Sequence, residues 1–275
     1  MVATVLLATT AAVSADERVT FDSARYLVGS LQQKLERERG EPIKRAPAET
    51  IQGYLSKPAG AGPFPAVVDL HGCGGLRATK RMSAGEQFTG WGYVTLVVDS
   101  FTTRGIKNAC TGGPSGSREA DAMGALIYLS KLPFVDPKRV AVVGYSQGGM
   151  AALEIASVRP FDLFEMPREL KFKAAVAYYP LCSAAADELA IPTVIFIGAA
   201  DDWAPPAECK NFMRRRDGKG APVTLIEYPG AYHDFDIPGV GDGMRYFGHW
   251  LQYDAAADAH SRAAMRDFLT RELSN

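Results

Sequence analysis

A serine flanked by two glycines stands in the segment Gly144-Tyr145-Ser146-Gln147-Gly148, at the spacing G-x-S-x-G. The segment follows a short apolar run and precedes a stretch with helical spacing. On a sharp strand-to-helix turn such a serine is held exposed, and small flanking residues let the strand and the helix approach closely. The pattern predicts nucleophilic attack by Ser146 on a carbonyl carbon. The alternative interpretation is a structural glycine-rich turn.

A serine nucleophile needs a base, and the chain has four histidines. His233 comes directly after the last predicted strand, Val223–Tyr228, so its loop can reach the turn that carries Ser146. His260 starts the last predicted helix and is expected to be a solvated side chain, and His71 is expected to brace its own loop. We therefore expect His233 to be the base; the alternative is a capping or core histidine.

The acid that orients the base should follow another strand between the serine and the histidine. Asp201 and Asp202 both follow the predicted strand Thr193–Ile197. Adjacent side chains point in different directions, so only one of these carboxylates can orient the imidazole. We favour Asp201 and leave Asp202 as the alternative, with the other carboxylate capping the helix that Pro205 begins.

A glycine-rich segment, His71-Gly72-Cys73-Gly74-Gly75, follows another buried strand and is the candidate oxyanion loop. The expected donors to the oxyanion are the backbone N–H groups of Cys73 and Gln147. The aromatic residues Tyr145, Trp203 and Tyr232 are expected in the substrate pocket, with ordinary core packing as the alternative.

Short apolar runs that alternate with helical patterns must position these residues. The predicted strands are Gln52–Ser56, Ala66–Leu70, Tyr93–Val98, Val140–Val143, Ala174–Tyr178, Thr193–Ile197 and Val223–Tyr228. The predicted helices are Arg118–Leu132 with Ser117 as its N-cap, Gly148–Val158, Ala207–Arg215 and Ser261–Leu273. Unbroken apolar strands are typical of a parallel sheet that is buried on both faces. We expect a three-layer α/β fold with helices on both faces and no large cap domain, formed by one domain over residues 16–275.

Composition and charge exclude several classes of protein. The 275 residues are 47% hydrophobic and 22% charged, with a net charge of -1, so neither a disordered chain nor a nucleic-acid-binding protein is indicated. The run Val2–Val13 is too short to span a bilayer, which needs about 20 residues.

Residues 1–15 resemble a signal peptide without a basic n-region, which favours export to the periplasm or beyond the cell. The alternative is a buried N-terminal helix in a cytoplasmic protein.

The four cysteines, Cys73, Cys110, Cys182 and Cys209, have no spacing typical of a zinc site, and we expect no metal. In an exported protein they could form two disulfides, and we expect Cys73–Cys110 and Cys182–Cys209, each joining two loops at the same edge of the sheet. Four free thiols are the alternative.

Together these motifs resemble the α/β-hydrolase superfamily, and within it the dienelactone-hydrolase-like branch. The segments that carry the resemblance are His71–Gly75, Asp99–Phe101 with Arg104 and Gly105, Val135–Val140, Gly144–Gly149, Gly198–Asp201 and Tyr228–His233. The best-known dienelactone hydrolases have a cysteine nucleophile, whereas this chain has Ser146. The resemblance therefore implies a serine carboxylesterase that acts on small or medium ester substrates without a cofactor.

Two further interpretations concern charged residues. Arginines hold the substrate carboxylate in that family, and Arg81 and Arg104 are candidates for this role, with solvated surface charge as the alternative. Arg118 and Asp121 are expected to form a local ion pair on one helix. A non-catalytic binding protein on the same scaffold, or a thioester or peptide hydrolase, stays open as an alternative function, and the oligomeric state is left undetermined.

Overall fold

A central sheet of eight strands organises the computed structural model, which describes residues 16–274 apart from 44, 46 and 158–162. The strand order is β1-β2-β4-β3-β5-β6-β7-β8. β4 and every strand beyond it pair in parallel, whereas β1 and β2 form an antiparallel edge. The expected α/β fold with a mostly parallel sheet is confirmed, and the described residues contain no large cap domain. The expected signal peptide, residues 1–15, lies outside the described residues.

The sheet strands are β1 Glu17–Asp22, β2 Thr50–Ser56, β3 Phe64–Leu70, β4 Val94–Asp99, β5 Val135–Tyr145, β6 Ala174–Tyr178, β7 Thr193–Gly198 and β8 Val223–Tyr228. A separate hairpin consists of β9 Met244–Tyr246 and β10 His249–Leu251. The helices are α1 Ser30–Glu38, α2 Ala78–Gly90, α3 Arg118–Leu129, α4 Gln147–Ala156, α5 Pro206–Arg216 and α6 Ala255–Leu273. Short 3-10 turns occur at Thr102–Arg104, Cys182–Ala184 and Pro238–Val240.

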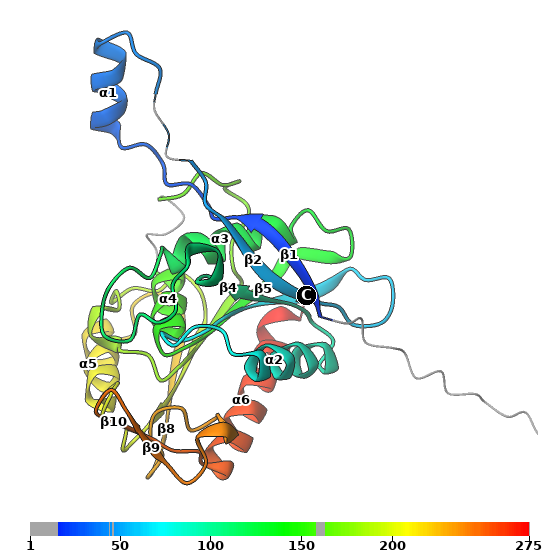
Figure 1. Cartoon of the computed structure of the whole chain (residues 1–275), viewed down its shortest axis with the longest axis vertical. Helices are drawn as coiled ribbons and strands as arrows, with labels where there is room; N and C mark the ends of the chain where they lie inside the picture. Colours follow the sequence, from blue (N-terminus) through cyan, green and yellow to red (C-terminus); the bar gives the residue numbers. More distant parts are fainter. Residues whose placement is uncertain (1–15, 44, 46, 158–162, 275) are drawn as a thin grey trace, which may run out of the picture.

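Helices pack on both faces of the sheet (Figure 1), and an apolar layer lies between the sheet and the helices on each face. Alternate residues of β3 illustrate the division, because Val68 packs with the layer under α3, α4 and α5, whereas Val67 packs with the layer under α2 and α6. Both valines are fully buried, as expected for a strand of a parallel sheet that is covered on both faces. Both faces of the sheet are therefore covered, and only its edges and the ends of its strands are open to a ligand.

All seven predicted strands and four predicted helices are present, with small differences at their ends. Ser117 caps α3, since its hydroxyl accepts a hydrogen bond from the Ala120 N–H at 3.1 Å. The last helix begins earlier than predicted, because the Asp254 carboxylate caps it by accepting from Ala256 and Ala257. β1, α1, α2 and the β9–β10 hairpin were not predicted from the sequence, and Figure 1 shows α1 projecting away from the sheet.

Two disulfides, Cys73–Cys110 and Cys182–Cys209, have the pairing expected from the sequence. The first joins two loops as expected, whereas the second joins the 3-10 turn at Cys182–Ala184 to α5. No helix among the described residues is long and apolar enough to cross a membrane. Within the same residues, no cluster of three or more potential metal ligands occurs. Disulfides of this kind persist in oxidising compartments.

Candidate active site

Ser146 stands in a strained backbone conformation between β5 and α4, with φ 53° and ψ -114°. The flanking glycines explain how such a turn fits. A Cβ atom on Gly144 would lie 2.0 Å from the carbonyl oxygen of Gly148, and one on Gly148 would lie 2.3 Å from that of Leu70. The Ser146 N–H donates to the Tyr178 carbonyl at 2.9 Å, which ties the turn to the neighbouring strand. The sharp turn expected from G-x-S-x-G is thus present.

A series of hydrogen bonds links Ser146 to His233 and Asp201. His233 Nε2 lies 3.0 Å from Ser146 Oγ, and His233 Nδ1 lies 2.7 Å from Asp201 Oδ2. The other carboxylate oxygen, Asp201 Oδ1, accepts from the N–H groups of Trp203 at 2.9 Å and Ala204 at 2.8 Å. These bonds fix the carboxylate, which in turn holds the imidazole with Nδ1 protonated and Nε2 free to accept the serine proton.

Asp202 and the remaining histidines take other positions. The Asp202 side chain is exposed and accepts from the Trp250 N–H at 3.1 Å, so it does not contact the His233 imidazole. His249 bonds through Nδ1 to the Asp202 carbonyl, and His260 to the Tyr228 hydroxyl. Of the two carboxylates left open by the sequence, Asp201 is the one that bonds to His233.

The environment of His233 raises its pKa above the ordinary value. Burial of the imidazole acts in the opposite direction and is the largest single effect. The hydrogen bond and the charge of Asp201 outweigh it, with smaller contributions from Asp234 and Asp236. The imidazolium that forms when His233 accepts a proton is therefore stabilised by nearby carboxylates.

The glycine-rich loop after β3 lies directly beside the serine. A Cβ atom on Gly72 would be only 3.4 Å from Ser146 Cβ, and Cys73 lines the same cleft as Ser146. Gln147 is the first residue of α4, so its N–H has no acceptor within the helix. Cys73 and Gln147, whose N–H groups are the expected oxyanion donors, thus line one cleft with Ser146 and come from two different elements.

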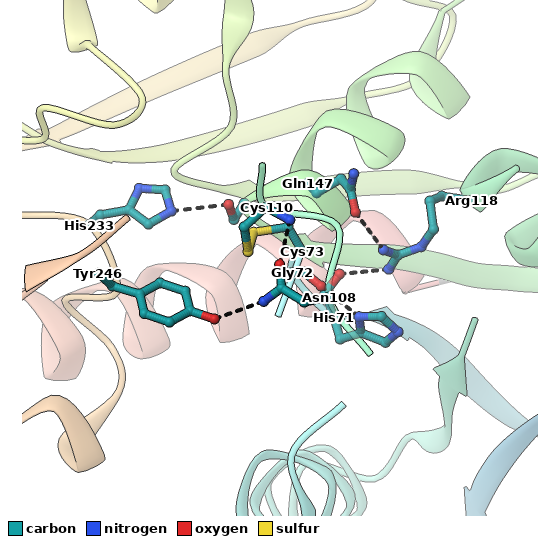
Figure 2. Close-up of a disulfide and its surroundings, with 10 residues drawn as sticks. His71, Gly72, Cys73, Asn108, Cys110, Arg118, Gln147, His233 and Tyr246 are labelled. Carbon is teal, nitrogen blue, oxygen red and sulfur yellow. Dashed lines mark hydrogen bonds between the residues drawn. A yellow bond between two sulfur atoms is a disulfide. The ribbon is translucent and has the colours of Figure 1, made fainter. Parts of the chain in front are cut away.

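Arg118 connects the glycine-rich loop and α4, a role that was not predicted from the sequence. Its buried guanidinium donates to the His71 carbonyl at 2.6 Å and to Gln147 Oε1 at 3.3 Å (Figure 2). Burial lowers the pKa of Arg118 to about 10, so the group stays charged at neutral pH. The expected ion pair of Arg118 with Asp121 is wrong, because Asp121 bonds to Arg104 instead.

His71 braces the oxyanion loop, in agreement with the role expected for it. Its Nδ1 lies 2.7 Å from the Gly72 carbonyl, and its Nε2 accepts from the Ser100 N–H at 3.3 Å. Burial, together with the charge of Arg118, lowers the pKa of His71 to about 3. The imidazole is therefore neutral over the ordinary pH range, as its bonding pattern requires.

The loop between the 3-10 turn at Thr102–Arg104 and α3 lies beside the site (Figure 2). The Cys73–Cys110 disulfide joins it to the oxyanion loop, and the Ala109 N–H donates to the Cys73 carbonyl at 2.9 Å. Asn108 reaches the β9–β10 hairpin, where its amide donates to the Tyr246 hydroxyl at 2.8 Å. Three separate segments are thereby fastened together around Ser146.

Two clefts meet at Ser146 and His233. One, of about 80 Å³, lies toward the oxyanion loop and α2 and includes Tyr145, Lys80 and Asp234 in its wall. The other, of about 140 Å³, lies toward α4. Trp203 and Tyr179 line both clefts. An ester bound at Ser146 would have room for one of its two halves on each side.

A cluster of polar side chains that was not predicted stands at the wall of the first cleft. The Lys80 ammonium stands 3.4 Å from the centre of the Tyr145 ring and forms an ion pair with Asp236 at 3.0 Å. Asp236 also accepts from the Tyr179 hydroxyl at 2.6 Å, and the Tyr179 ring packs on His233. The sequence gives no signal for this cluster, because its members lie on different elements.

Three expectations about the pocket need correction or restriction. Arg104 does not line the pocket, since its guanidinium bonds to Asp121, Glu49 and the Ser100 carbonyl. Tyr232 lies outside both clefts and packs near Trp250. Arg81 pairs with Asp16. Among the expected pocket residues, Tyr145 and Trp203 are those found at the site.

Solved structures of similar fold include several hydrolases. A dienelactone hydrolase-like promiscuous phosphotriesterase from metagenomic libraries is 20% identical, with a TM-score of 0.66, over 93% of this chain and 98% of that one. A thermophilic esterase from the Planctomycetes species Thermogutta terrifontis, solved with propionate bound, is 20% identical, with a TM-score of 0.62, over 82% and 90% of the two chains. Esterase 2 of that species, solved after phosphorylation by paraoxon, is also 20% identical, with a TM-score of 0.60, over 83% and 91%.

The family-level comparison covers most of the chain. The model of the dienelactone hydrolase family matches residues 51–273, from the second strand to the end of the last helix. This range contains the glycine-rich loop, the serine turn and the loops that carry Asp201 and His233. With its matching sheet and strand-end loops, this chain belongs to the dienelactone hydrolase family.

Proposed function

We propose that the protein is a serine hydrolase that cleaves carboxylic esters of small or medium size through an acyl-enzyme intermediate. The observation that carries this proposal is the hydrogen-bonded series from Ser146 through His233 to Asp201, at the junction of two open clefts. Membership of a hydrolase family and the folds of the similar esterases support the same reaction class. The site requires no metal or organic cofactor for this chemistry.

In the proposed mechanism, Ser146 Oγ attacks the ester carbonyl carbon while His233 Nε2 takes the serine proton. Asp201 stabilises the resulting imidazolium and keeps its orientation. The N–H groups of Cys73 and Gln147 donate to the oxyanion, and each donor of this kind contributes about 2.7–4 kcal/mol in other enzymes. His233 then protonates the leaving alcohol. Water, deprotonated by the same imidazole, attacks the acyl-enzyme and releases the carboxylic acid.

The serine-to-alanine variant tests this assignment. Ser146→Ala should lower kcat on p-nitrophenyl acetate by about 10⁴ to 10⁶, the range seen when other triads lose their nucleophile. A fluorophosphonate probe should label the wild-type protein on Ser146 and leave the variant unlabelled. A folded wild-type protein that neither reacts with the probe nor hydrolyses any ester would support a non-catalytic binding protein instead. Parallel rates on thioesters and aminoacyl amides separate the remaining acyl-transfer activities.

A phosphoryl substrate is a second candidate, favoured by the similar phosphotriesterase and by the esterase that paraoxon phosphorylates. The same oxyanion donors that would accept a carbonyl oxygen could accept a phosphoryl oxygen. Incubation with paraoxon should release p-nitrophenol. Release that stops at one equivalent identifies Ser146 as a covalent target only, whereas continued release identifies phosphotriester turnover.

We also propose that residues 16–275 act as one domain that is exported after removal of residues 1–15. The two disulfides support an oxidising location. Amino-terminal sequencing of the protein secreted by its native cell should begin near Asp16. Export would be contradicted by a protein that keeps Met1 and in which a thiol reagent alkylates all four cysteines without prior reduction.

A further inference from the structure

We propose that an apolar groove along α4 binds the alkyl chain of the ester substrate, so that esters with medium-length chains are preferred over acetates. This inference rests on the proposed ester hydrolysis. The groove, of about 260 Å³, is lined by Met150, Leu153, Leu181, Ala184 and Ala185, with Glu119 and Glu154 beside them. It lies outside the arrangement of Ser146, His233 and Asp201.

The groove is continuous with the reacting centre. The cleft on the α4 side of Ser146 is also lined by Met150 and Leu181, and these two side chains form the boundary that it shares with the groove. Both side chains are open to solvent, with exposed fractions of 36% for Met150 and 38% for Leu181. A chain that leaves the carbonyl carbon on this side would cover them and remove their apolar surface from water.

The helix itself sets the direction and the length of the groove. Ser146 is the N-cap of α4, and Met150 and Glu154 follow it at intervals of four residues, so the three lie along one face. At 1.5 Å per residue the distance from Ser146 to Glu154 along the axis is about 12 Å. An acetyl group would end before the groove begins, whereas a medium-length alkyl chain would extend into it.

The opposite wall is held in place by covalent bonds. Leu181 and Ala184 flank Cys182, which the second disulfide joins to Cys209 in α5. Both cysteines are fully buried. A wall fixed on one side by a helix and on the other by a disulfide offers a preformed apolar surface, which reduces the entropy lost on binding.

The charges of the groove indicate a neutral chain. Its charged lining residues are both acidic, Glu119 and Glu154, and the lining residues in the described chain include no lysine or arginine. A carboxylate at the end of the bound chain would be repelled by the Glu119 side chain, whereas a methyl end would not. The geometry therefore favours a monocarboxylic alkyl ester over the half-ester of a dicarboxylic acid.

The test compares kcat/KM for p-nitrophenyl acetate, butyrate and octanoate, and for ethyl and octyl acetates. All substrates are used at concentrations below those at which they form micelles. The larger alkyl chain should be preferred by roughly tenfold or more in one of the two series, the effect of about two buried methylene groups. Met150→Asp should lower that preference by roughly tenfold, because a charge would then face the chain. Ala184→Trp should lower kcat/KM for the octyl or octanoyl substrate more than for the butyrate, because the larger side chain fills the groove that only the longer chain enters.

Met82→Asp is the matched control, since Met82 is an exposed methionine on α2 that lines none of the clefts described above. It should leave the chain-length preference unchanged. The proposal is overturned if the wild-type protein hydrolyses acetates but shows no preference in either series, or if Met150→Asp lowers all rates equally. In those cases the proposed ester hydrolysis still stands. A wild-type protein that hydrolyses no ester overturns both proposals.

Discussion

The single imidazole of His233 controls the pH range in which the site can act. Its raised pKa comes from Asp201, which overcomes the opposite effect of burial. The base must be neutral to accept the serine proton, so kcat/KM is expected to rise with pH through a midpoint above the ordinary histidine value of about 6.5. His71 contributes nothing to this rise, because its pKa is lowered to about 3.

The variant Asp201→Asn tests this origin of the pKa. It should move the midpoint of the kcat/KM profile to lower pH and reduce kcat by about 10⁴, as an equivalent change does in another triad enzyme. Asp202→Asn serves as the control, since Asp202 makes no hydrogen bond to the imidazole. A midpoint that stays in place in Asp201→Asn would show that another group sets the profile.

Arg118 is a second residue whose role depends on its exact partners. It bonds to the carbonyl of His71 and to the side chain of Gln147, and so links the two segments that carry the expected oxyanion donors. Arg118→Met should lower kcat by roughly tenfold with little change in KM, since misplaced donors weaken transition-state binding. Arg118→Lys, which keeps the charge, should recover part of the rate. A rise in KM at unchanged kcat would contradict this positioning role.

Arg118 and Arg104 also mark the limit of sequence reasoning at this scale. The hydrogen-bonded arrangement of Ser146, Asp201 and His233 was predictable because each residue lies in the turn or loop after a recognisable strand. The partners of an arginine depend instead on how distant elements pack. One signal was available, because Arg118 lies in the first turn of α3, where the helix dipole disfavours a cation and a specific acceptor is therefore expected.

At the scale of elements, the Cys73–Cys110 disulfide fastens the oxyanion loop to the loop before α3. The two disulfides close loops of similar length, with sequence separations of 37 and 27 residues. Each should therefore stabilise the fold by a similar amount, about 3 to 4 kcal/mol. They differ in position, because only the first lies in the wall of both clefts.

We expect the double variant Cys73→Ala/Cys110→Ala to lower kcat on p-nitrophenyl acetate by roughly tenfold, less than the loss of a whole oxyanion donor. Both double variants should lower the melting temperature by similar amounts. Cys182→Ala/Cys209→Ala, however, should leave kcat on this short substrate nearly unchanged. Steady-state kinetics and thermal unfolding measured on both proteins separate the two effects. Equal changes in kcat for the two variants would mean that the first disulfide has only a stabilising role.

The elements that were predicted from the sequence differ in burial from those that were not. The central strands were predictable because both of their faces are covered, which leaves unbroken apolar runs. β9 and β10 have three residues each, too few for a periodic pattern. α2 was missed because its packing uses small residues: a Cβ atom on Gly85 would lie 2.9 Å from Ser56 Oγ. Such close contact between a helix and a strand leaves little apolar periodicity to detect.

For the whole molecule, the core contains one charge that no hydrogen bond satisfies. Asp69 is the penultimate residue of β3, fully buried, and both of its carboxylate oxygens lack a hydrogen-bond partner among the described residues. Burial raises its pKa to about 6; Lys80 opposes the shift and Asp236 adds to it. Because folded Asp69 retains its proton up to about pH 6, its contribution to the stability of the fold is larger at low pH than at neutral pH. Aspartates whose pKa is lowered in the folded state have the opposite effect.

Between the ordinary value of 3.8 and about 6, folded Asp69 holds a proton that the unfolded chain releases. Its contribution to the free energy of unfolding is therefore present at low pH and lost as pH rises through about 6, by about 3 kcal/mol. Asp69→Asn cannot ionise and should lack this loss. Urea unfolding of both proteins at a series of pH values measures it. The buried histidine His71 acts in the opposite direction, but equally in both proteins, so the difference between their profiles isolates Asp69. Parallel profiles would mean that Asp69 does not titrate in this range.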